Sequence, residues 1–338
     1  MRVIVTGGAG YIGSHCSIAL MEKGHDVIVA DNFQIGRREI AASLKSLDLP
    51  GKLLKVVEAD LNDQKGLKKV FEGGGIDAVI HFAALSQVGE SMNNPKKYYR
   101  NNVGGTMNLL DAMLDRGVDK IVFSSTAAVY GEPVRVPVDE ECPQMPINPY
   151  GASKLMIERI MDNYDKAYGL KSVRFRYFNV AGADIGCRVG EWHEPETHLI
   201  PNILRSVFKG GEDFKLYGND YPTRDGTCVR DYVNVEDLAD AHIMALEYLF
   251  KGGSTDFFNL GTNEGNTVLE VLKECENVTG KRIPVTLMPR RPGDPSVLTA
   301  DNSKVKRVMG WTPRRTLRQS IETAYEWENK RQRISEPF

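Results

Sequence analysis

The sequence is poor in cysteine, has no long apolar run and carries little net charge. Its 338 residues include 5 scattered cysteines and no C-x-x-C pair, so neither a zinc cluster nor a disulfide framework is expected. No apolar run approaches the roughly 20 residues that a membrane helix needs. Glycines interrupt the first apolar run, which is unlike a signal peptide. The formal net charge of -2 gives no basic field for nucleic acid or a membrane surface. We therefore expect a cytoplasmic protein with neither of these partners.

The first half of the chain does contain a regular alternation of short apolar segments and helical patterns. Continuous apolar segments are typical of parallel strands that are buried on both faces. These segments lie at 2–7, 26–31, 53–60, 77–84, 119–126 and 172–179, with helical patterns at 11–24, 105–117 and 154–169. The alternation predicts an α/β fold of the Rossmann type, with a doubly wound parallel sheet.

The pattern changes about half-way along the chain. Prolines, glycines and short mixed segments follow, together with helical patterns at 235–250 and 316–329. Length alone suggests about two domains. We predict a Rossmann domain over residues 1–180 and a smaller mixed α/β domain over residues 181–338. The segment from about 232 to 262 is expected to return to the first domain.

A glycine-rich loop follows the first predicted strand and opens the first predicted helix. Gly7, Gly10 and Gly13 are spaced G-x-x-G-x-x-G in VTGGAGYIG. Glycines let the backbone turn tightly and approach a pyrophosphate, and the helix N-terminus supplies N–H donors. The alternative is a glycine-rich turn without a ligand, which the strand–loop–helix context disfavours. The loop therefore predicts a dinucleotide cofactor.

The next two predicted strands end in carboxylates. Asp31 lies 18 residues after the last glycine of the loop, where it can accept hydrogen bonds from ribose hydroxyls and repel a 2′-phosphate. Asn32 follows it in place of an arginine, and we interpret Arg37 and Arg38 as a solvated helix start. This pattern favours NAD over NADP. Asp60 could bind the adenine amino group or, almost equally well, cap a helix.

Tyr150 and Lys154 lie four residues apart at the start of a predicted helix and so share one of its faces. A phenol has a pKa near 10, too high for a base at neutral pH, and a nearby ammonium or cationic nicotinamide would lower it. Ser124, Ser125 and Thr126 end the fifth strand, at the sheet edge where doubly wound folds bind ligands. A hydroxyl there could pass a substrate proton to Tyr150. The alternative is a chance Y-x-x-x-K pair, since long helical proteins carry a few.

Several motifs together make the chain similar to a known family. They are VTGGAGYIGSH, VIHFAA…VGES, YYRNNVGGT, SSTAAVYG, PYGASK, RYFNVAGA, GNDYPTRDGTCVRDYVNV and RRPGD. On these motifs, which span essentially the whole chain, the sequence resembles the extended short-chain dehydrogenases/reductases. Within them it is similar to the nucleotide-sugar 4-epimerases that interconvert UDP-glucose and UDP-galactose. The resemblance implies a bound NAD, a UDP-sugar substrate and a homodimer.

The resemblance also implies roles for individual residues. It makes Tyr150 the base, Lys154 its partner and Thr126 the hydroxyl. For NAD it implies Gly7, Gly10, Tyr11, Ile12, Gly13, Asp31, Asn32, Phe33, Asp60, Leu61, Phe82, Ala83, Ala84, Ser86, Asn101, Ser124, Tyr150, Lys154 and Tyr177. For the UDP-sugar it implies Thr126, Phe178, Asn179, His198, Leu199, Lys215, Leu216, Tyr217, Arg230, Arg291, Asp294 and Leu298.

Some of these positions depart from the family pattern or have other interpretations. His198 stands where some members carry Asn, and Ser86 stands where many carry a Lys near the cofactor, which leaves its role open. Arg230 and Arg291 could pair bidentately with a dianionic pyrophosphate, although either alone could be a surface charge. His193 and His198 suggest a metal pair, but we expect no metal because no third ligand recurs nearby.

The implied reaction is inversion at C4 of the hexose through a transient 4-keto sugar. Tyr150 takes the hydroxyl proton, NAD takes the C4 hydride, the sugar turns, and both are returned. Such a site grips the nucleotide and holds the sugar loosely. In this family a side chain near the RRPGD loop limits the sugar pocket, and it is Leu298 here where some members carry Tyr. We hypothesise that Leu298 also admits the 2-acetamido group of UDP-GlcNAc and UDP-GalNAc.

Three alternative functions remain: a nucleotide-sugar 4,6-dehydratase, a UDP-uronate 4-epimerase and an NAD-sensing protein without catalysis. A dehydratase needs an acidic pair after the catalytic Thr, where this chain has Ala127 and Ala128. A sensor would be expected to lack the Tyr/Lys pair, which is intact here. The implied homodimer would pack through the helices near 96–114 and 154–164, which could equally be ordinary sheet-covering helices.

Overall fold

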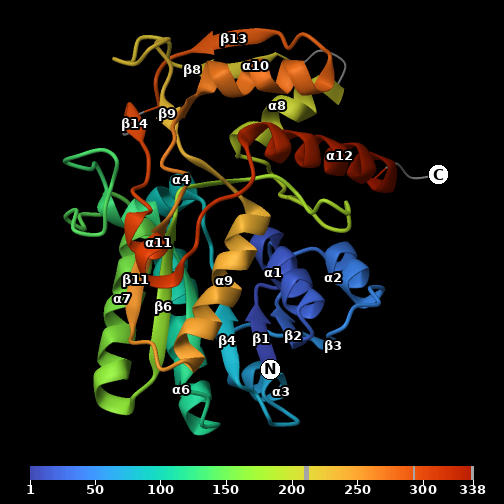
Figure 1. Cartoon of the computed structure of the whole chain (residues 1–338), viewed down its shortest axis with the longest axis vertical. Coiled ribbons are helices and arrows are strands. Elements are labelled where there is room, and N and C mark those ends of the chain that lie inside the picture. Colours follow the sequence, from blue (N-terminus) through green and yellow to red (C-terminus); the bar gives the residue numbers. More distant parts are fainter. Residues whose placement is uncertain (209–212, 292–293, 336–338) are drawn as a thin grey trace.

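The main feature of the computed structural model is a seven-stranded parallel sheet (Figure 1). The structure describes residues 1–208, 213–291 and 294–335. In spatial order the strands are β11 (Asp256–Leu260), β6 (Lys171–Tyr177), β5 (Lys120–Thr126), β4 (Ala78–His81), β1 (Arg2–Thr6), β2 (Asp26–Asp31) and β3 (Leu53–Glu58). The strand order reverses between β1 and β4, and ligands of doubly wound sheets bind beyond the carboxyl ends at such a point. The predicted Rossmann-type α/β fold is confirmed.

Helices cover both faces of this sheet, as the crossover connections of a parallel sheet require. Those that bury apolar side chains against one face are α1 (Tyr11–Glu22), α2 (Arg38–Lys45), α9 (Val235–Phe250) and α11 (Ser303–Met309). Those on the other face are α3 (Gln64–Val70), α6 (Gly105–Asp115) and α7 (Pro149–Tyr168). The core of the molecule therefore consists of two apolar layers separated by the sheet.

One edge of the sheet is built by the second half of the chain. β11 pairs with β6 in parallel, from Asp256 opposite Val173 to Leu260 opposite Tyr177, and α9 packs against α1. Both elements lie within the segment from about 232 to 262. The apolar patterns predict the other strands of the sheet but not β11, whose sequence DFFNL is interrupted by Asn259 and so is not a continuous apolar segment.

A smaller group of elements lies beyond the carboxyl ends of the strands, at the top of Figure 1. Its helices are α8 (Leu199–Phe208), α10 (Val268–Thr279) and α12 (Leu317–Ser335). Its strands are β7 (Asn179–Ala181) with β10 (Tyr232–Asn234), β8 (Phe214–Tyr217) with β13 (Val285–Met288), and β12 (Asn266–Thr267) with β9 (Val229–Arg230) and β14 (Val297–Leu298). The three helices and the strands β7, β8 and β10 contribute residues to a third apolar cluster.

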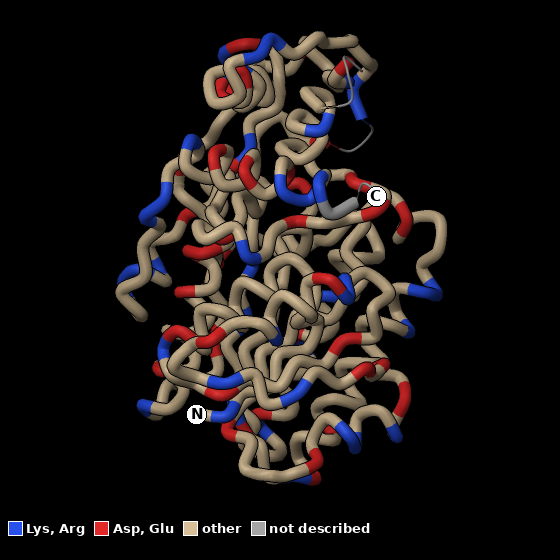
Figure 2. The backbone as a smooth tube through the Cα atoms, turned by 90° about the vertical axis from the view of Figure 1, so that its right-hand side faces the viewer, with Lys and Arg blue, Asp and Glu red and all other residues tan. Residues whose placement is uncertain are grey.

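Short helical segments connect the larger elements near the sheet's carboxyl edge. They are α4 (Val88–Asn93), α5 (Pro95–Tyr98), the π-helical turn η1 (Tyr99–Gly104) and the 3₁₀ turn η2 (Ala127–Tyr130). Basic and acidic residues are interspersed along the chain in Figure 2, in keeping with the small net charge. Among the described residues, no helix combines the length and apolar character needed to cross a membrane.

Candidate active site

A cavity of about 330 Å³ lies beyond the carboxyl ends of the strands, where the strand order reverses. The predicted cofactor residues that line it are Gly7, Gly10, Tyr11, Ile12, Gly13, Asp31, Asn32, Asp60, Leu61, Phe82, Ala83, Ala84, Ser86, Asn101, Ser124, Tyr150, Lys154 and Tyr177. The predicted substrate residues that line it are Thr126, Phe178, Asn179 and His198. One cavity thus brings together residues that lie between Gly7 and His198 in the sequence.

The glycine-rich loop is shaped so closely that side chains would not fit. Gly7 has a φ of +68°, and a Cβ there would lie 2.7 Å from the amide nitrogen of Ala83. A Cβ on Gly13 would lie 2.2 Å from the carbonyl oxygen of Gly7. Gly10 is the N-cap of α1 and lines the cavity. The N-terminal, positive end of this helix therefore faces the cavity. The loop has the properties of a pyrophosphate-binding turn.

Asp31 fixes this loop from the end of β2. Its Oδ2 accepts the N–H of Ala9 at 3.0 Å, and its Oδ1 accepts the N–H of Phe33 at 2.8 Å. Burial raises the pKa of this carboxyl, and the two N–H donors lower it. Phe33 is not among the residues that line the cavity, and Arg38 lies over its ring at 4.4 Å from the centroid. The contact of Phe33 with the cofactor therefore stays a prediction.

The two arginines near Asp31 already pair with carboxylates, which disfavours binding of the 2′-phosphate of NADP. Arg37 lies 3.1 Å from Glu194, and Arg38 lies 2.7 Å from Glu58, so both arginines already have carboxylate partners. The interpretation of these arginines as merely solvated is incomplete in this respect. A 2′-phosphate would face the Asp31 carboxylate without an unpaired arginine beside it, so the site favours NAD over NADP.

Asp60 lies next to Asn32 on the cavity wall. Its Oδ2 accepts a hydrogen bond from Asn32 Nδ2 at 2.9 Å, and its Oδ1 accepts the N–H of Asn62 at 2.8 Å. These amides hold the carboxylate at the end of β3. The alternative role of Asp60 as a helix cap is wrong, because Asp63 is the N-cap of α3 and accepts the N–H of Lys65.

Tyr150 occupies the first turn of α7, at a helix start that the sequence specifies well. Asn148 is the N-cap and its side chain accepts the N–H of Gly151 at 2.8 Å, while Pro149 takes the first helical position. Tyr150 follows directly, so its phenol lies near the positive end of the helix dipole. The Thr126 side chain at the end of β5 lies close enough to lower the pKa of this phenol.

Lys154 lies one turn further along the same face of α7 and is 2% exposed. Its Nζ donates to the carbonyl oxygen of Ser124 at 2.7 Å and lies 4.7 Å from the centroid of the Phe123 ring. Burial lowers the pKa of Lys154 to about 7, although the charge of Glu158 acts to raise it. The charge of this ammonium is therefore adjustable near neutral pH.

Burial, not charge, is the main influence of the protein on the phenol. It raises the pKa of Tyr150, and the Thr126 side chain lowers it. The lowering of this pKa by an ammonium together with a cationic nicotinamide stays a prediction, and burial is the largest influence among the chain's own residues. Tyr177, also on the cavity wall, has its pKa raised well above the usual value by burial, and its hydroxyl lies 2.5 Å from His242 Nε2. Tyr177 is thus held as a neutral phenol.

A buried ionic network supports the catalytic helix from behind, and sequence reasoning missed it. Glu158 lies one turn after Lys154 and accepts hydrogen bonds from Arg176 Nη2 at 2.5 Å, Arg176 Nε at 3.0 Å and Ser125 Oγ at 2.5 Å. Arg176 Nη1 also donates to the Tyr130 hydroxyl at 2.8 Å. A signal was available in the sequence, because the strand pattern RFRY places arginines in a segment predicted to be buried.

The other predicted substrate residues lie in the upper group of elements, away from the lining of this cavity. They are Leu199, Lys215, Leu216, Tyr217, Arg230, Arg291, Asp294 and Leu298. Leu216 is buried in the third apolar cluster, so its side chain serves packing. Arg291 lies over the Tyr217 ring at 4.0 Å from the centroid. Two residues of the RRPGD motif, 292 and 293, lie outside the described residues.

Two of these residues pair with each other. Arg230 is 8% exposed, its Nη2 is bonded to an Asp294 carboxylate oxygen, and its Nη1 donates to the carbonyl oxygen of Val229 at 2.7 Å. The guanidinium predicted to meet a pyrophosphate is therefore held by a carboxylate in this structure. Leu298 lies opposite Arg230 in the pairing of β14 with β9 and packs against the apolar cluster that contains Phe178.

Known proteins share this architecture along the whole chain. A family model described as GDP-mannose 4,6 dehydratase matches residues 4–324. The UDP-glucose 4-epimerase of Lactobacillus helveticus is 49% identical over 328 residues, which cover 97% of this chain and 97% of that protein. The chain belongs to the UDP-glucose 4-epimerase family. A crystal structure of a UDP-glucose 4-epimerase, at 43% identity, covers 100% of both chains with a TM-score of 0.93. The UDP-glucose 4-epimerase of Brucella ovis, solved in complex with NAD, has a TM-score of 0.90 at 43% identity and covers 96% of this chain and 97% of its own.

The residues of this member of the UDP-glucose 4-epimerase family fit a dinucleotide. The loop at Gly7 and Gly13 has no room for a Cβ, the N-terminus of α1 faces the cavity, and Asp31 ends the second strand beside it. The family model is named for a dehydratase, but the two positions after Thr126 are Ala127 and Ala128 rather than acids.

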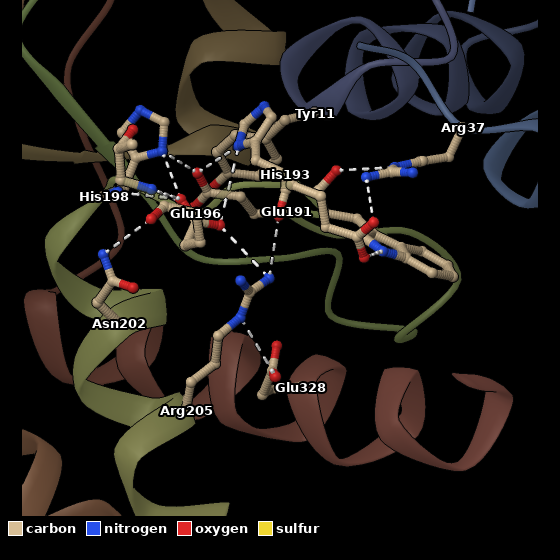
Figure 3. Close-up of polar contacts among 12 residues, drawn as sticks. Tyr11, Arg37, Glu191, His193, Glu196, His198, Asn202, Arg205 and Glu328 are labelled. Carbon is tan, nitrogen blue, oxygen red and sulfur yellow. Dashed lines mark hydrogen bonds and ion pairs between the residues drawn. The ribbon is translucent and has the colours of Figure 1, made fainter. Parts of the chain in front are cut away.

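A second group of polar side chains lines the cavity near Tyr11. His193 and His198 lie beside the carboxylates of Glu191 and Glu196, as Figure 3 shows. The reason for expecting no metal, the lack of a third ligand near the two histidines, is therefore wrong. The argument from the sequence counted histidines and cysteines and overlooked the carboxylates in the same short segment.

Proposed function

We propose that this protein interconverts UDP-glucose and UDP-galactose as a UDP-glucose 4-epimerase, using bound NAD and passing through a 4-keto sugar. The observation that carries the proposal is the convergence of Tyr150, Lys154 and Thr126 on the same cavity as the glycine-rich loop. The proposal is supported by the family membership of the chain and by the relatives' names.

Tyr150 acts as the base that removes the proton from the 4-hydroxyl of the hexose. Its place in the first turn of α7 favours the phenolate, and Thr126, whose side chain also lowers the pKa of the phenol, can relay the proton. When bound, NAD supplies a reversible acceptor for the C4 hydride. Tyr150 holds the proton until the sugar has turned and then returns it to the oxygen on the other face. Because the reaction is redox-neutral, we expect NAD to stay bound between turnovers.

Lys154 holds a positive charge behind the phenol. Its Nζ is fixed by the Ser124 carbonyl, so the ammonium keeps its place while the sugar turns. A low-dielectric surrounding strengthens the attraction between this ammonium and the phenolate that forms. Asn179 and His198, on the same cavity wall, are proposed to contact the UDP-sugar, and the role of Ser86 toward NAD is proposed as a hydroxyl contact. The contacts implied for Lys215, Arg230, Asp294 and their neighbours remain predictions.

Turnover of UDP-galactose with no added NAD tests the proposal. The purified protein should convert UDP-galactose to UDP-glucose, as followed by proton NMR of the anomeric signals, while Tyr150→Phe should be slower by about 10²–10⁴-fold. UDP-galacturonate is assayed in parallel, because conversion of that substrate alone would favour the uronate epimerase. Absence of any product, even after NAD is supplied, would overturn the proposal and favour a non-catalytic NAD sensor.

We further propose that Leu298 leaves the sugar pocket wide enough for a 2-acetamido group. Leu is smaller than the Tyr of some relatives, and Leu298 packs beside Phe178, a residue of the cavity wall. The protein should then epimerise UDP-GalNAc as well as UDP-galactose. Leu298→Tyr should abolish turnover of UDP-GalNAc and keep that of UDP-galactose. Unchanged turnover of UDP-GalNAc by this variant would show that the gate lies elsewhere.

We also propose that the protein is a homodimer that works in the cytoplasm. The free state of all five cysteines supports a reducing compartment. On the two helices predicted to form the interface, Met107 of α6 is 42% exposed and Met156 of α7 is 46% exposed. The helices adjoin through a hydrogen bond from the Tyr164 hydroxyl to Asp111 at 2.6 Å. Light scattering should give about twice 37.7 kDa, and Met107→Asp with Met156→Asp should give the monomer mass.

A further inference from the structure

Four side chains with metal-binding atoms converge on the cavity wall beside the glycine-rich loop (Figure 3). They are Glu191, His193, Glu196 and His198, and one ligand atom from each lies within 4.8 Å of all the others. His198 Nδ1 lies 2.7 Å from a Glu191 oxygen and 2.9 Å from a Glu196 oxygen. His193 Nδ1 lies 3.1 Å from the same Glu191 oxygen and 3.9 Å from the other oxygen of Glu196.

The hydrogen bonds within the group leave some of its polar atoms without a matching partner. An imidazole nitrogen donates at most one hydrogen, but His198 Nδ1 faces two carboxylate oxygens at hydrogen-bond distance. The Glu196 side chain is 1% exposed, and its Oε2 is buried without a hydrogen-bond partner within the described part of the chain. Arg205 approaches that oxygen only to 3.6 Å. A buried carboxylate oxygen that faces the group and lacks a hydrogen bond is an acceptor that a bound cation could satisfy.

We propose that this group is a zinc-type divalent cation site, with the Nδ1 atoms of His193 and His198 and one oxygen each of Glu191 and Glu196 as its four ligands. Zinc binds imidazole nitrogen and carboxylate oxygen at about 2.0–2.2 Å in a tetrahedron, which places neighbouring ligand atoms about 3.3 Å apart. The separations of 2.7, 2.9, 3.1 and 3.9 Å lie on both sides of that value. The separations of 2.9 and 3.9 Å are to different oxygens of Glu196, so this side chain would turn to place a single oxygen between the two imidazoles.

The types of ligand atom in the group determine which cation it would bind. Magnesium and calcium prefer shells of oxygen alone, whereas imidazole with carboxylate suits zinc and its first-row neighbours. All four ligands come from the protein, which is the arrangement of a structural site rather than one that holds a reacting water. His198 has a side chain that is 49% exposed, so the cation can reach the site from the solvent.

The surroundings indicate what the cation would stabilise. Arg205 of α8 lies 3.6 Å from Glu196 and 3.6 Å from Glu328 of α12, which links the group to the upper elements. The ring of His193 lies 6.4 Å from that of Tyr11, the first residue of α1. The cation would therefore fix the segment 191–198 between the cofactor loop and α8, and it would hold His198 as a ligand. This inference does not depend on the proposed epimerase activity.

Metal content of the untagged protein tests the site directly. The protein is stripped with a chelator, titrated with Zn²⁺ and passed through a desalting column, and the zinc that remains is measured by mass spectrometry. We expect about one zinc per chain and a rise of the melting temperature with Zn²⁺. Co²⁺ in place of zinc should give the visible absorption of a tetrahedral nitrogen and oxygen site. A strong sulfur-to-cobalt band would place the metal on cysteines and overturn the proposal.

Variants in the same segment locate the site. His193→Gln and Glu196→Gln should each weaken zinc binding at least 100-fold. The matched control is Glu194→Gln, which changes a neighbouring glutamate that pairs with Arg37 and is not in the group, and it should keep wild-type binding. If the variants bind zinc like the control, or if the stripped wild-type protein retains no zinc, the group is only a network of histidine–glutamate ion pairs. The wild-type measurement decides this even if a variant fails to fold.

Discussion

Replacement of Glu158 by leucine should separate the stability of the catalytic helix from its chemistry. The side chain of Glu158 is 3% exposed and that of its partner Arg176 is 0% exposed. Glu158→Leu leaves the guanidinium of Arg176 buried without its carboxylate. Loss of one partner of a buried pair costs about 3–5 kcal/mol, and Ser125, which donates to the same carboxylate at 2.5 Å, also loses its acceptor. We expect the free energy of unfolding to fall by about 4 kcal/mol.

Replacing both Glu158 and Arg176 should cost less stability than replacing either residue alone. Arg176→Met alone leaves Glu158 buried and unpaired, so it should cost about as much as Glu158→Leu. The double variant Glu158→Leu/Arg176→Met puts apolar groups of similar size in both positions and should lie within about 2 kcal/mol of the wild type. With about 4 kcal/mol lost in each single variant and at most about 2 kcal/mol in the double variant, the coupling energy should be about 6 kcal/mol or more, which is the signature of a buried pair.

The double variant should regain stability but should not regain the wild-type activity at pH 7. The charge of Glu158 acts to raise the pKa of Lys154, which burial holds at about 7. Without Glu158 this pKa falls further, so Lys154 is mostly neutral at pH 7. The double variant should therefore turn over UDP-galactose slowly at pH 7 and regain activity as the pH is lowered toward 6, where Lys154 is protonated again.

Two assays check this reasoning. Urea unfolding followed by tryptophan fluorescence gives the free energies, with the buried Trp311 and Trp327 as reporters. Turnover of UDP-galactose between pH 5.5 and 8.5 gives the pH profile. A loss below about 1 kcal/mol for Glu158→Leu would refute the buried-pair energetics. A wild-type pH profile in the double variant would show that Glu158 does not act through Lys154.

Four further predictions follow from the site. Tyr150→Phe should lower kcat with UDP-galactose by about 10²–10⁴-fold and leave the calorimetric affinity for UDP unchanged; near-normal turnover would exclude the phenol as the base. Gly13→Ala places a Cβ 2.2 Å from the Gly7 carbonyl oxygen, so the protein should be purified almost free of NAD, and full occupancy would contradict the tight loop. Asp31→Ala should lower the preference for NAD over NADP at least tenfold in a fluorescence titration. An unchanged preference would show that the carboxylate does not face the ribose. Burial lowers the pKa of Lys154 from 10.5 to about 7, so the unfolded chain binds more protons between these pH values and the unfolding free energy should rise with pH by up to about 1.4 kcal/mol per unit. Lys154→Met should lack this rise, and parallel stability curves for the two proteins would contradict it.

The sheet and the cofactor loop could be predicted because their signals are local. A strand buried on both faces is a continuous apolar segment, and the turn at Gly7 and Gly13 needs glycine for reasons that lie within a few residues. The start of α7 was also local, since Asn148 and Pro149 cap it directly before Tyr150. The strand β11 could not be found this way, because its identity as a sheet edge depends on pairing with β6.

The features that sequence reasoning missed depend on contacts between distant elements or on burial. Arg230 and Asp294 are 64 positions apart, and nothing in either motif shows that they pair. The pKa of Tyr150 is governed mainly by burial, which spacing does not show. The carboxylates near His193 and His198 are close in sequence but were overlooked because glutamate is common on surfaces and carries no spacing signature of its own.

The edge strand β11 has a consequence for the synthesis of the chain. β6 ends at Tyr177 and β11 begins at Asp256, so the ribosome adds roughly 80 residues between them. At about 5–20 residues per second, the free edge of β6 waits about 4–16 s for its partner. An unpaired edge invites association with other nascent chains, and charged side chains oppose it. Arg174 and Arg176 lie on this strand, and the nascent chain carries both charges while it waits. A fragment released near residue 180 would keep that edge open for its whole lifetime.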